Sequence, residues 1–323
     1  MSQTEGRTWL SPDHPLAGAE EKFWRAHEHF ESLNEEIRAL AAGEVHSATF
    51  RDELKPHAKN VFCSVVATVE PPPLRLATII GDIVHNLRSS LDHLVFELGF
   101  LGLGGQVPRR TAYPVCFTRQ DWLRPYTQNT LLQGVMPHHR AIIYRTQPCY
   151  RRKDAPTNPR TVRRRRRRPL ADLENLWNHD KHRVLQPVVL APVKIEGTVG
   201  AAQDCLIAGL PRLNPKFLGS PLEVGTEVFA TPIRPTGPEP YVHVQFEMEA
   251  QIGFRNGLEV RETLAHIGTA VSVILTRFER EFETPTARKL WHLPRGGWIE
   301  RDIGIRWRKT IFRGPDHKTT TSW

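Results

Sequence analysis

The strongest periodic pattern in the chain is LRLATIIGDIVHNLRSSLDHLVFELGF, residues 74–100. Its large apolar residues recur every three or four positions, which is the period of an α-helix with one buried face. They are Leu76, Ile80, Ile83, Leu87, Leu91, Leu94 and Leu98. The sequence therefore predicts a long amphipathic helix over residues 74–98, ended by Gly102, Gly104 and Gly105.

The segments on either side of this helix set the fold class. Helical periodicity returns in residues 19–42, 130–145, 169–178 and 257–283, with Pro137 starting or kinking the second of these. Residues 184–256 consist of short β-branched runs separated by prolines and glycines, a pattern typical of antiparallel sheet. Residues 61–69 read as a further short strand, with a buried helical turn as the alternative. We predict an α+β fold, with a helical bundle and an antiparallel β segment before the last long helix.

These elements divide the chain into five predicted parts. They are an N-terminal tail (1–18), a helical bundle with an arginine-rich loop at 145–168 (19–183), an antiparallel β segment (184–256), a helix completing the bundle (257–283) and a basic C-terminal extension (284–323).

The composition of the 323-residue chain, with 39% hydrophobic residues, is that of a soluble globular protein. No run approaches the roughly 18 apolar residues of a membrane helix, and the first residues lack the apolar region of a signal peptide. We therefore expect a cytoplasmic protein with no membrane partner. The four cysteines are widely spaced with no C-x-x-C pair, which favours buried thiols over a disulfide framework or thiolate metal site. No cofactor motif is present, and we predict neither a cofactor nor a metal.

The formal net charge of +9 is unevenly distributed. Residues 145–168 hold eleven Lys and Arg against a single acid, Asp154, and include six consecutive arginines: Arg163, Arg164, Arg165, Arg166, Arg167 and Arg168. Residues 286–323 hold nine basic and three acidic residues, interleaved with Trp291, Trp298 and Trp307. The arginine run is either a solvated linker or a contact for the phosphates of a nucleic acid. The tail is either a docked extension or a surface for single-stranded nucleic acid.

A polar arc lies opposite the leucine stripe of the helix at 74–98, with Arg88 at its edge. Its members are Asp82, Asn86, Ser89, Ser90, His93 and Glu97. Ordinary solvated helix faces are rich in Lys, Glu and Gln, whereas these side chains are mostly short and bond to fixed partners. The arc is therefore either a solvent-exposed helix face or a functional site.

Arg88 and His93 are separated by four residues, and this R-x4-H spacing resembles the signature of the HEPN superfamily. Its members are helical bundles in which an Arg and a His form a metal-independent ribonuclease centre, usually across a dimer. The resemblance implies RNA as a partner, a homodimer, and catalysis by Arg88 and His93, with Ser89 where the family often has Asn or Asp. More broadly, NLRSSLDHLVFEL (86–98), YPVCF (113–117) and NLWNHDKHR (175–183) resemble an uncharacterised bacterial protein family, which implies no activity.

A second polar cluster, residues 178–183, follows the predicted helix at 169–178 and suggests a complete ribonuclease centre. RNA cleavage by its own 2′-hydroxyl needs a base, an acid and cations beside the phosphate. In this hypothesis His93 is the base and His182 the acid. Arg88 and Arg183 hold the phosphate, and Asp92 or Asp180 orients an imidazole. The cluster could instead cap a helix C-terminus, or His179, His182 and Asp180 could share a metal ion.

Two function classes follow. The first is an RNA-binding protein or metal-independent ribonuclease, of a toxin-like or stress-related kind. The second is a non-enzymatic protein in which Arg88, Asp92, His93 and residues 180–183 form a polar network that joins two helices. A small-molecule binder using the β segment is a third interpretation. Exposure separates the first two, because a catalytic His93 must line an open surface whereas a structural one is covered.

Overall fold

The computed structural model describes residues 10, 13–42, 49–57, 60–68, 72–150, 169–182, 188–210, 212–213, 226–238, 241–254, 258–282, 305–310, 312–313 and 319–320. The chain divides into two compact units. The helical unit combines residues 1–33, 77–186 and 261–300, and the β unit combines residues 34–76, 187–260 and 301–323. The predicted α+β class, with a helical bundle and an antiparallel β segment before the last long helix, is confirmed.

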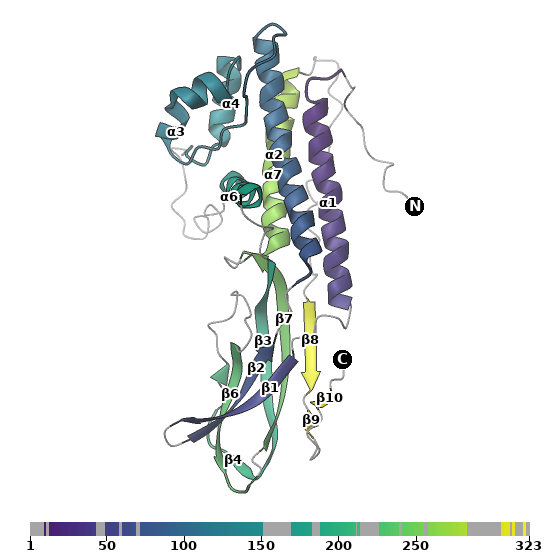
Figure 1. Ribbon diagram of the computed structural model, residues 1–323, viewed down its shortest axis with the longest axis vertical. Helices are drawn as coiled ribbons and strands as arrows, with labels where there is room; N and C mark the ends of the chain where they lie inside the picture. The colour runs from purple at the N-terminus through teal and green to yellow at the C-terminus, as the bar shows by residue number, and fades with distance from the viewer. Residues whose placement is uncertain are drawn as a thin grey trace, which may run out of the picture. The chain divides into compact units, whose positions relative to one another are not determined.

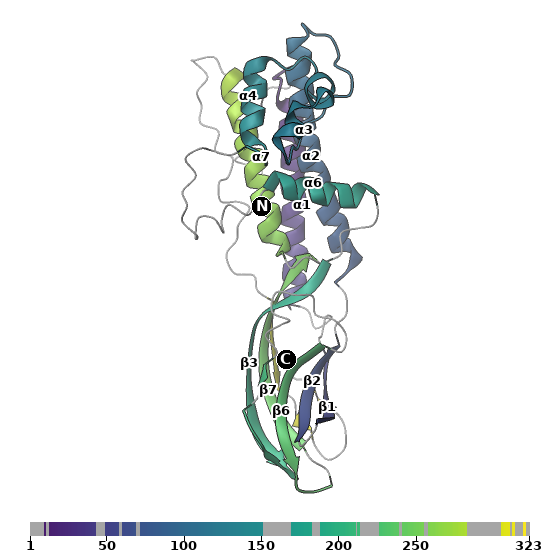
Figure 2. The same ribbon diagram turned by 90° about the vertical axis from the view of Figure 1, so that its left-hand side faces the viewer.

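Three long helices form the body of the helical unit: α1 (Ala17–Ala42), α2 (Leu74–Gly102) and α7 (Val260–Phe282). They run side by side in both views of the ribbon (Figures 1 and 2). The predicted leucine stripe of α2 is the core, since each of its residues is no more than 1% exposed. Phe23 and Phe30 of α1 and Leu264 and Phe278 of α7 are equally buried. Burial of these facing stripes is the main source of stability of such a bundle.

The C-terminal end of α2 is fitted closely against the chain that follows it. A Cβ added at Gly102 would collide with the carbonyl oxygen of Gly134, and one at Gly99 would lie 2.6 Å from the carbonyl oxygen of Gln133. Gly104 then takes a positive φ of 65°, which ends the helix in the left-handed conformation that glycine favours.

Shorter helices cover this body. They are α3 (Arg119–Leu123), the π-helical turn η1 (Tyr126–Leu131), α4 (Pro137–Thr146) and α6 (Pro169–His182). The helix predicted over 130–145 begins at Pro137, because Gly134 breaks the backbone with a φ of 76° and proline favours the first turn of a helix. α6 lies across the long helices, as Figure 2 shows.

The described strands of the β unit pair in antiparallel fashion. One sheet has the order β1-β2-β6-β4, with β5 also paired to β6, and a second has the order β3-β7-β8. Their bounds are Thr49–His57 (β1), Asn60–Thr68 (β2), Val188–Gln203 (β3), Cys205–Ile207 (β4), Arg212–Leu213 (β5), Thr226–Pro235 (β6), Tyr241–Phe254 (β7) and Ile305–Thr310 (β8). The short strands β9 (Phe312–Arg313) and β10 (Thr319–Thr320) pair with each other.

The β1–β2 hairpin falls inside the range 19–183 that the sequence assigned to the helical bundle. β2 matches the short strand expected at 61–69, but β1 was not expected, because its sequence TFRDELKPH is charged and contains Pro56. Within the described strands, β1 ends the order β1-β2-β6-β4. Edge strands tolerate charged residues and proline, since one side of their backbone has no partner strand.

Candidate functional site

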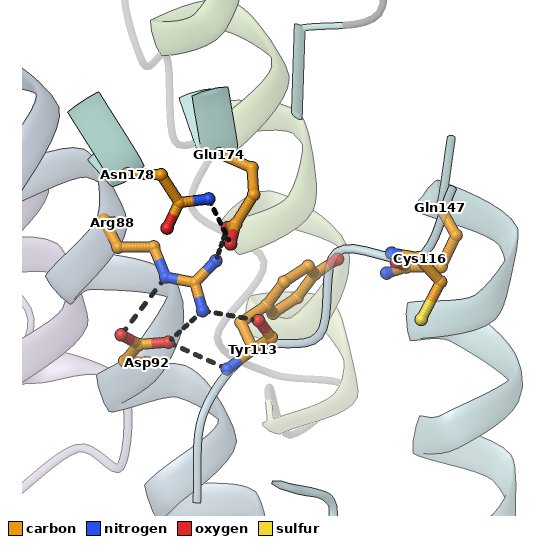
Figure 3. Close-up of polar contacts among 7 residues, drawn as sticks. All are labelled: Arg88, Asp92, Tyr113, Cys116, Gln147, Glu174 and Asn178. Atoms are coloured by element: carbon orange, nitrogen blue, oxygen red, sulfur yellow. Dashed lines mark hydrogen bonds and ion pairs between the residues drawn. The ribbon is translucent and has the colours of Figure 1, made fainter. Parts of the chain in front are cut away.

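Arg88 lies on the part of α2 that meets α6, and the residue is only 8% exposed. Its Nη1 donates a hydrogen bond to Glu174 Oε2 on α6 at 2.7 Å. Its Nη2 donates to the carbonyl oxygen of Tyr113 at 2.7 Å, and its Nε donates to Asp92 Oδ2 at 3.3 Å. Figure 3 shows the guanidinium between the two carboxylates. The side chain therefore joins α2, α6 and the segment around Tyr113.

Asp92 stands one helical turn after Arg88, the spacing at which side chains on a helix meet. Its Oδ1 accepts a hydrogen bond from the backbone N–H of Tyr113 at 2.8 Å and lies 3.3 Å from Arg88 Nη2. The N–H of Tyr113 is thus held by Asp92 while its carbonyl is held by Arg88. Because both backbone groups of Tyr113 are bonded by α2, this residue is fixed in position and orientation.

Glu174 completes the group from α6. Besides its bond to Arg88, its Oε1 accepts from Asn178 Nδ2 at 3.3 Å. We call Arg88, Asp92, Glu174 and the Tyr113 carbonyl the arginine clamp. Side-chain exposure is 10% for Arg88, 34% for Asp92 and 23% for Glu174. One guanidinium therefore bonds two carboxylates at a half-buried position, where charge-assisted hydrogen bonds are strong. The two carboxylates repel any further anion.

Residues 113–117, which we call the strap, lead from the clamp to the end of α4. The Tyr113 hydroxyl shares a short hydrogen bond with Thr146 Oγ1. The Cys116 N–H donates to Gln147 Oε1 at 2.9 Å, and Gln147 Nε2 donates in turn to the carbonyl of Ile143 at 3.1 Å. Tyr113 is fully buried, and this burial raises the pKa of its phenol above the ordinary range.

His93 is exposed and lies on another side of α2, beside the start of α1. A Cβ added at Gly18 would lie 3.1 Å from His93 Nδ1. Two residues five apart on a helix are rotated by about 140° from each other. The guanidinium of Arg88 and the imidazole of His93 accordingly face different neighbours, and the R-x4-H spacing does not bring them together within one chain.

The rest of the polar arc has mixed surroundings. Asp82 is exposed, whereas Asn86 and Ser90 are buried. Ser90 Oγ donates to the Ala19 carbonyl of α1 at 2.7 Å, and Asn86 Nδ2 donates to the Asp82 carbonyl at 2.8 Å. These short side chains bond to backbone partners, as expected from their residue types. Burial raises the pKa of Glu97, and the charge of nearby His93 acts in the opposite direction.

Several predicted site residues lie outside the described part of the molecule. The backbone of residues 178–182 belongs to α6, but the side chains of Asp180, Lys181 and His182 are not described. Arg183 and the run Arg163–Arg168 also lie outside the described residues. The pairing of His93 with His182 and the roles of Asp180 and Arg183 stay predictions. Among the described residues, no group of three or more His, Cys, Asp and Glu could hold a metal ion.

Sequence reasoning missed Glu174, the strap and an aromatic contact. Glu174 is one acid among several in its helix, and only its spacing of four from Asn178 hints at a shared face. His85 of α2 and Trp177 of α6 lie with ring centroids 5.3 Å apart, and the His85 side chain is exposed. Ser89 Oγ lies 3.5 Å from His85 Nε2. An exposed imidazole beside a tryptophan is a surface on which a flat ligand could stack.

In the part of the chain that the structure describes, no helix has the length and apolar character needed to cross a membrane. Comparison of the chain with known protein families, with curated proteins and with solved structures found no match.

Proposed function

We propose that this chain is a non-catalytic RNA-binding protein. In this proposal the arginine-rich segment 145–168 contacts the RNA, and the arginine clamp is a brace that fixes the helices beside it. The observation that supports the brace is the bonding of Arg88, whose guanidinium is buried and bonded to Asp92, Glu174 and the Tyr113 carbonyl.

Phosphate binding by an arginine requires N–H donors of the guanidinium that are available to the phosphate oxygens. To bind a phosphate, Arg88 would have to leave Glu174 or Asp92, and the released carboxylate would repel the incoming anion. The guanidinium would also break its 2.7 Å bond to the Tyr113 carbonyl. These costs favour a structural role for Arg88 over the phosphate-binding role that the R-x4-H spacing implies. His93 is exposed, as a catalytic histidine must be, but its exposure supplies no cation for a phosphate while Arg88 is held by its two carboxylates.

The RNA contact is assigned to the arginine-rich segment because of its charge and its attachment. Eleven basic residues against one acid give this segment a net charge of +10. The chain on one side is fixed by the strap through Thr146 and Gln147, and α6 on the other side is fixed by the clamp through Glu174. Arginine side chains release counterions from a phosphate backbone, which gives affinity without sequence specificity. The exposed His85 beside Trp177 offers a stacking contact for a base.

The test is one assay of binding and cleavage with end-labelled single-stranded RNA. In the first variant, all six arginines of the run 163–168 are replaced by glutamine. A matched variant replaces six basic residues of the C-terminal extension by glutamine: Arg288, Lys289, Arg295, Arg301, Arg313 and Lys318. Both lose the same formal charge, so a difference between them reports position and not net charge.

We expect the wild-type protein to bind RNA without cutting it, and the variant of the run 163–168 to bind at least about tenfold more weakly. The variant of the extension should keep more of the affinity. A third variant, His93→Ala, should behave as wild type. RNA cleavage that survives a chelator and disappears with His93→Ala would overturn the non-catalytic proposal in favour of the ribonuclease. Equal affinity of wild type and the variant of the run would overturn the assignment of the RNA contact.

A further inference from the structure

Two cysteines that are far apart in the sequence lie next to each other in the fold. Cys116 is in the strap, and Cys149 follows α4 by three residues. The backbone N–H of Cys149 donates to the carbonyl oxygen of Cys116 at 3.0 Å. With standard backbone bond lengths, this hydrogen bond places the two Cα atoms at most about 7 Å apart. Disulfides usually span Cα separations of about 4.4–6.8 Å, and only pairs more than about 7 Å apart cannot be bridged without backbone movement. The bound therefore leaves the two residues within reach of a cross-link.

The backbone around both residues is well fixed, which holds the two chain segments next to each other. The Cys116 N–H is bound by Gln147 Oε1 at 2.9 Å, and the Tyr150 N–H bonds the Gln147 carbonyl at 3.0 Å. The ring of Tyr150 also contacts Tyr144 of α4 edge-on, with centroids 5.4 Å apart. Cys149 is therefore part of an ordered turn that lies against the strap.

The two thiols differ in their access to solvent. Cys116 is 3% exposed, whereas Cys149 is half-buried. Burial, helped by the nearby Cys149 and Asp121 and opposed by the charge of Arg124, raises the pKa of Cys116 to about 12. Burial also raises the pKa of Cys149. At neutral pH both groups are thiols, so any oxidation is slow and begins at Cys149, the less buried of the two residues.

We propose that Cys116 and Cys149 form a reversible intramolecular disulfide when the protein meets a peroxide oxidant. The Cys149 sulfur attacks one peroxide oxygen, the O–O bond breaks, and water leaves with the thiol proton, which gives a sulfenic acid on Cys149. The Cys116 sulfur then attacks the Cys149 sulfur, the S–O bond breaks, and a second water leaves with the Cys116 proton. Two thiols are oxidised by two electrons in total, and one peroxide is reduced to two waters.

The cross-link would close a loop that contains α3, η1 and α4 and would fix the end of α4 to the strap. Closing a loop of this size restricts the unfolded chain and stabilises the fold. We expect a rise in the melting temperature of about 5 °C or more. The proposal does not depend on RNA binding, and its test uses no RNA.

The test treats the full-length reduced protein with hydrogen peroxide at pH 8.5 and then counts free thiols after denaturation. The wild-type chain has four cysteines, so the count should fall from four to two. Peptide mapping under non-reducing conditions should identify one linked pair, Cys116 with Cys149, and dithiothreitol should restore all four thiols.

Two single variants serve as matched controls, and each begins with three thiols. Cys149→Ser should keep all three through the peroxide treatment and show no rise in melting temperature. Cys205→Ser should still form the cross-link, because Cys205 lies in β4 of the other unit. A wild-type count that stays at four, a linked pair other than Cys116 with Cys149, or oxidation that dithiothreitol does not reverse would each overturn the proposal.

Discussion

Arg88 holds a permanent positive charge at a position that is only 8% exposed. Moving an ion out of water costs several kcal/mol, and the cost is offset only where partners satisfy the buried donors. Two carboxylates and a backbone carbonyl surround this guanidinium. The arginine fork suits this place because its donors point in fixed directions toward separate acceptors, which a lysine ammonium cannot reproduce.

Replacing Arg88 by methionine keeps a long side chain and removes the charge. The change leaves Asp92 and Glu174 half-buried without their cation and frees the carbonyl of Tyr113. We expect the free energy of unfolding to fall by about 3–5 kcal/mol, measured by urea denaturation. Arg75→Met is the control on the same helix. Arg75 is bonded to Glu36 at 2.7 Å but its side chain is 69% exposed, so its loss should cost about 1 kcal/mol or less. Equal costs for the two variants would contradict the clamp.

At the scale of elements, the strap connects parts of the helical unit that are distant in sequence. Its first residue is bonded to α2 through Asp92 and Arg88, and its side chain reaches Thr146 at the end of α4. Further along, Cys116 is bonded to Gln147. The strap has no regular secondary structure, so its backbone groups need these side-chain partners.

The strap should make the protein less stable at high pH, because it buries two groups that would ionise there. Burial raises the pKa of Cys116 to about 12 and moves that of Tyr113 in the same direction. In the unfolded chain a thiol ionises near pH 8.5. Above that pH the unfolded chain loses a proton that the folded chain keeps, so stability falls as pH rises, by up to about 1.4 kcal/mol per pH unit and group.

The measurement is the free energy of unfolding from pH 7 to pH 11 for reduced wild type and Cys116→Ala. The variant should be less stable at pH 7, since it loses a buried side chain. Its stability should then decline less steeply above pH 9, so the two curves converge. Parallel curves over this range would show that the Cys116 thiol ionises equally in both states.

The sequence predicted secondary structure correctly where a spacing or a residue type is specific to one kind of element. The leucine stripe predicted α2 because a period of three to four residues is specific to helices, and Pro137 marked the start of α4. The strand β1 was missed because an edge strand can contain charges and a proline. Such positions do not show the alternation of a half-buried strand.

The candidate site was less accessible from the sequence. The spacing of Arg88 and His93 is visible in the sequence. Glu174, the partner of Arg88 on α6, is 86 residues away along the chain. Another partner is a backbone carbonyl, which has no sequence signature. The short polar residues of the arc did indicate fixed partners, as Ser90 and Ala19 show. What the pattern could not specify was which neighbour each side chain would face, because that depends on how the helices pack.

For the whole molecule, the distribution of charge is the property that bears most on RNA binding. The chain has a net charge of +9. Residues 145–168 and residues 286–323 together carry more positive charge than this total, so the remaining residues have a negative net charge. The remainder of the chain is acidic and repels a polyanion at long range. RNA should therefore be held by local contacts to the two basic segments, and the number of those contacts can be measured by titration with salt.

The affinity for single-stranded RNA should fall linearly in a plot of log K against log salt concentration, with a slope of about −0.7 per phosphate contact. If each arginine of the run Arg163–Arg168 meets one phosphate, replacing all six by glutamine reduces the magnitude of the slope by about 4. The dissociation constant should be measured at salt concentrations from about 50 to about 200 mM, a range over which counterion release changes the affinity measurably. The variant of the C-terminal extension reports how many contacts that segment adds. A slope for the run variant equal to that of wild type would place the RNA elsewhere, because lost phosphate contacts must appear in the slope whatever the sequence of the RNA.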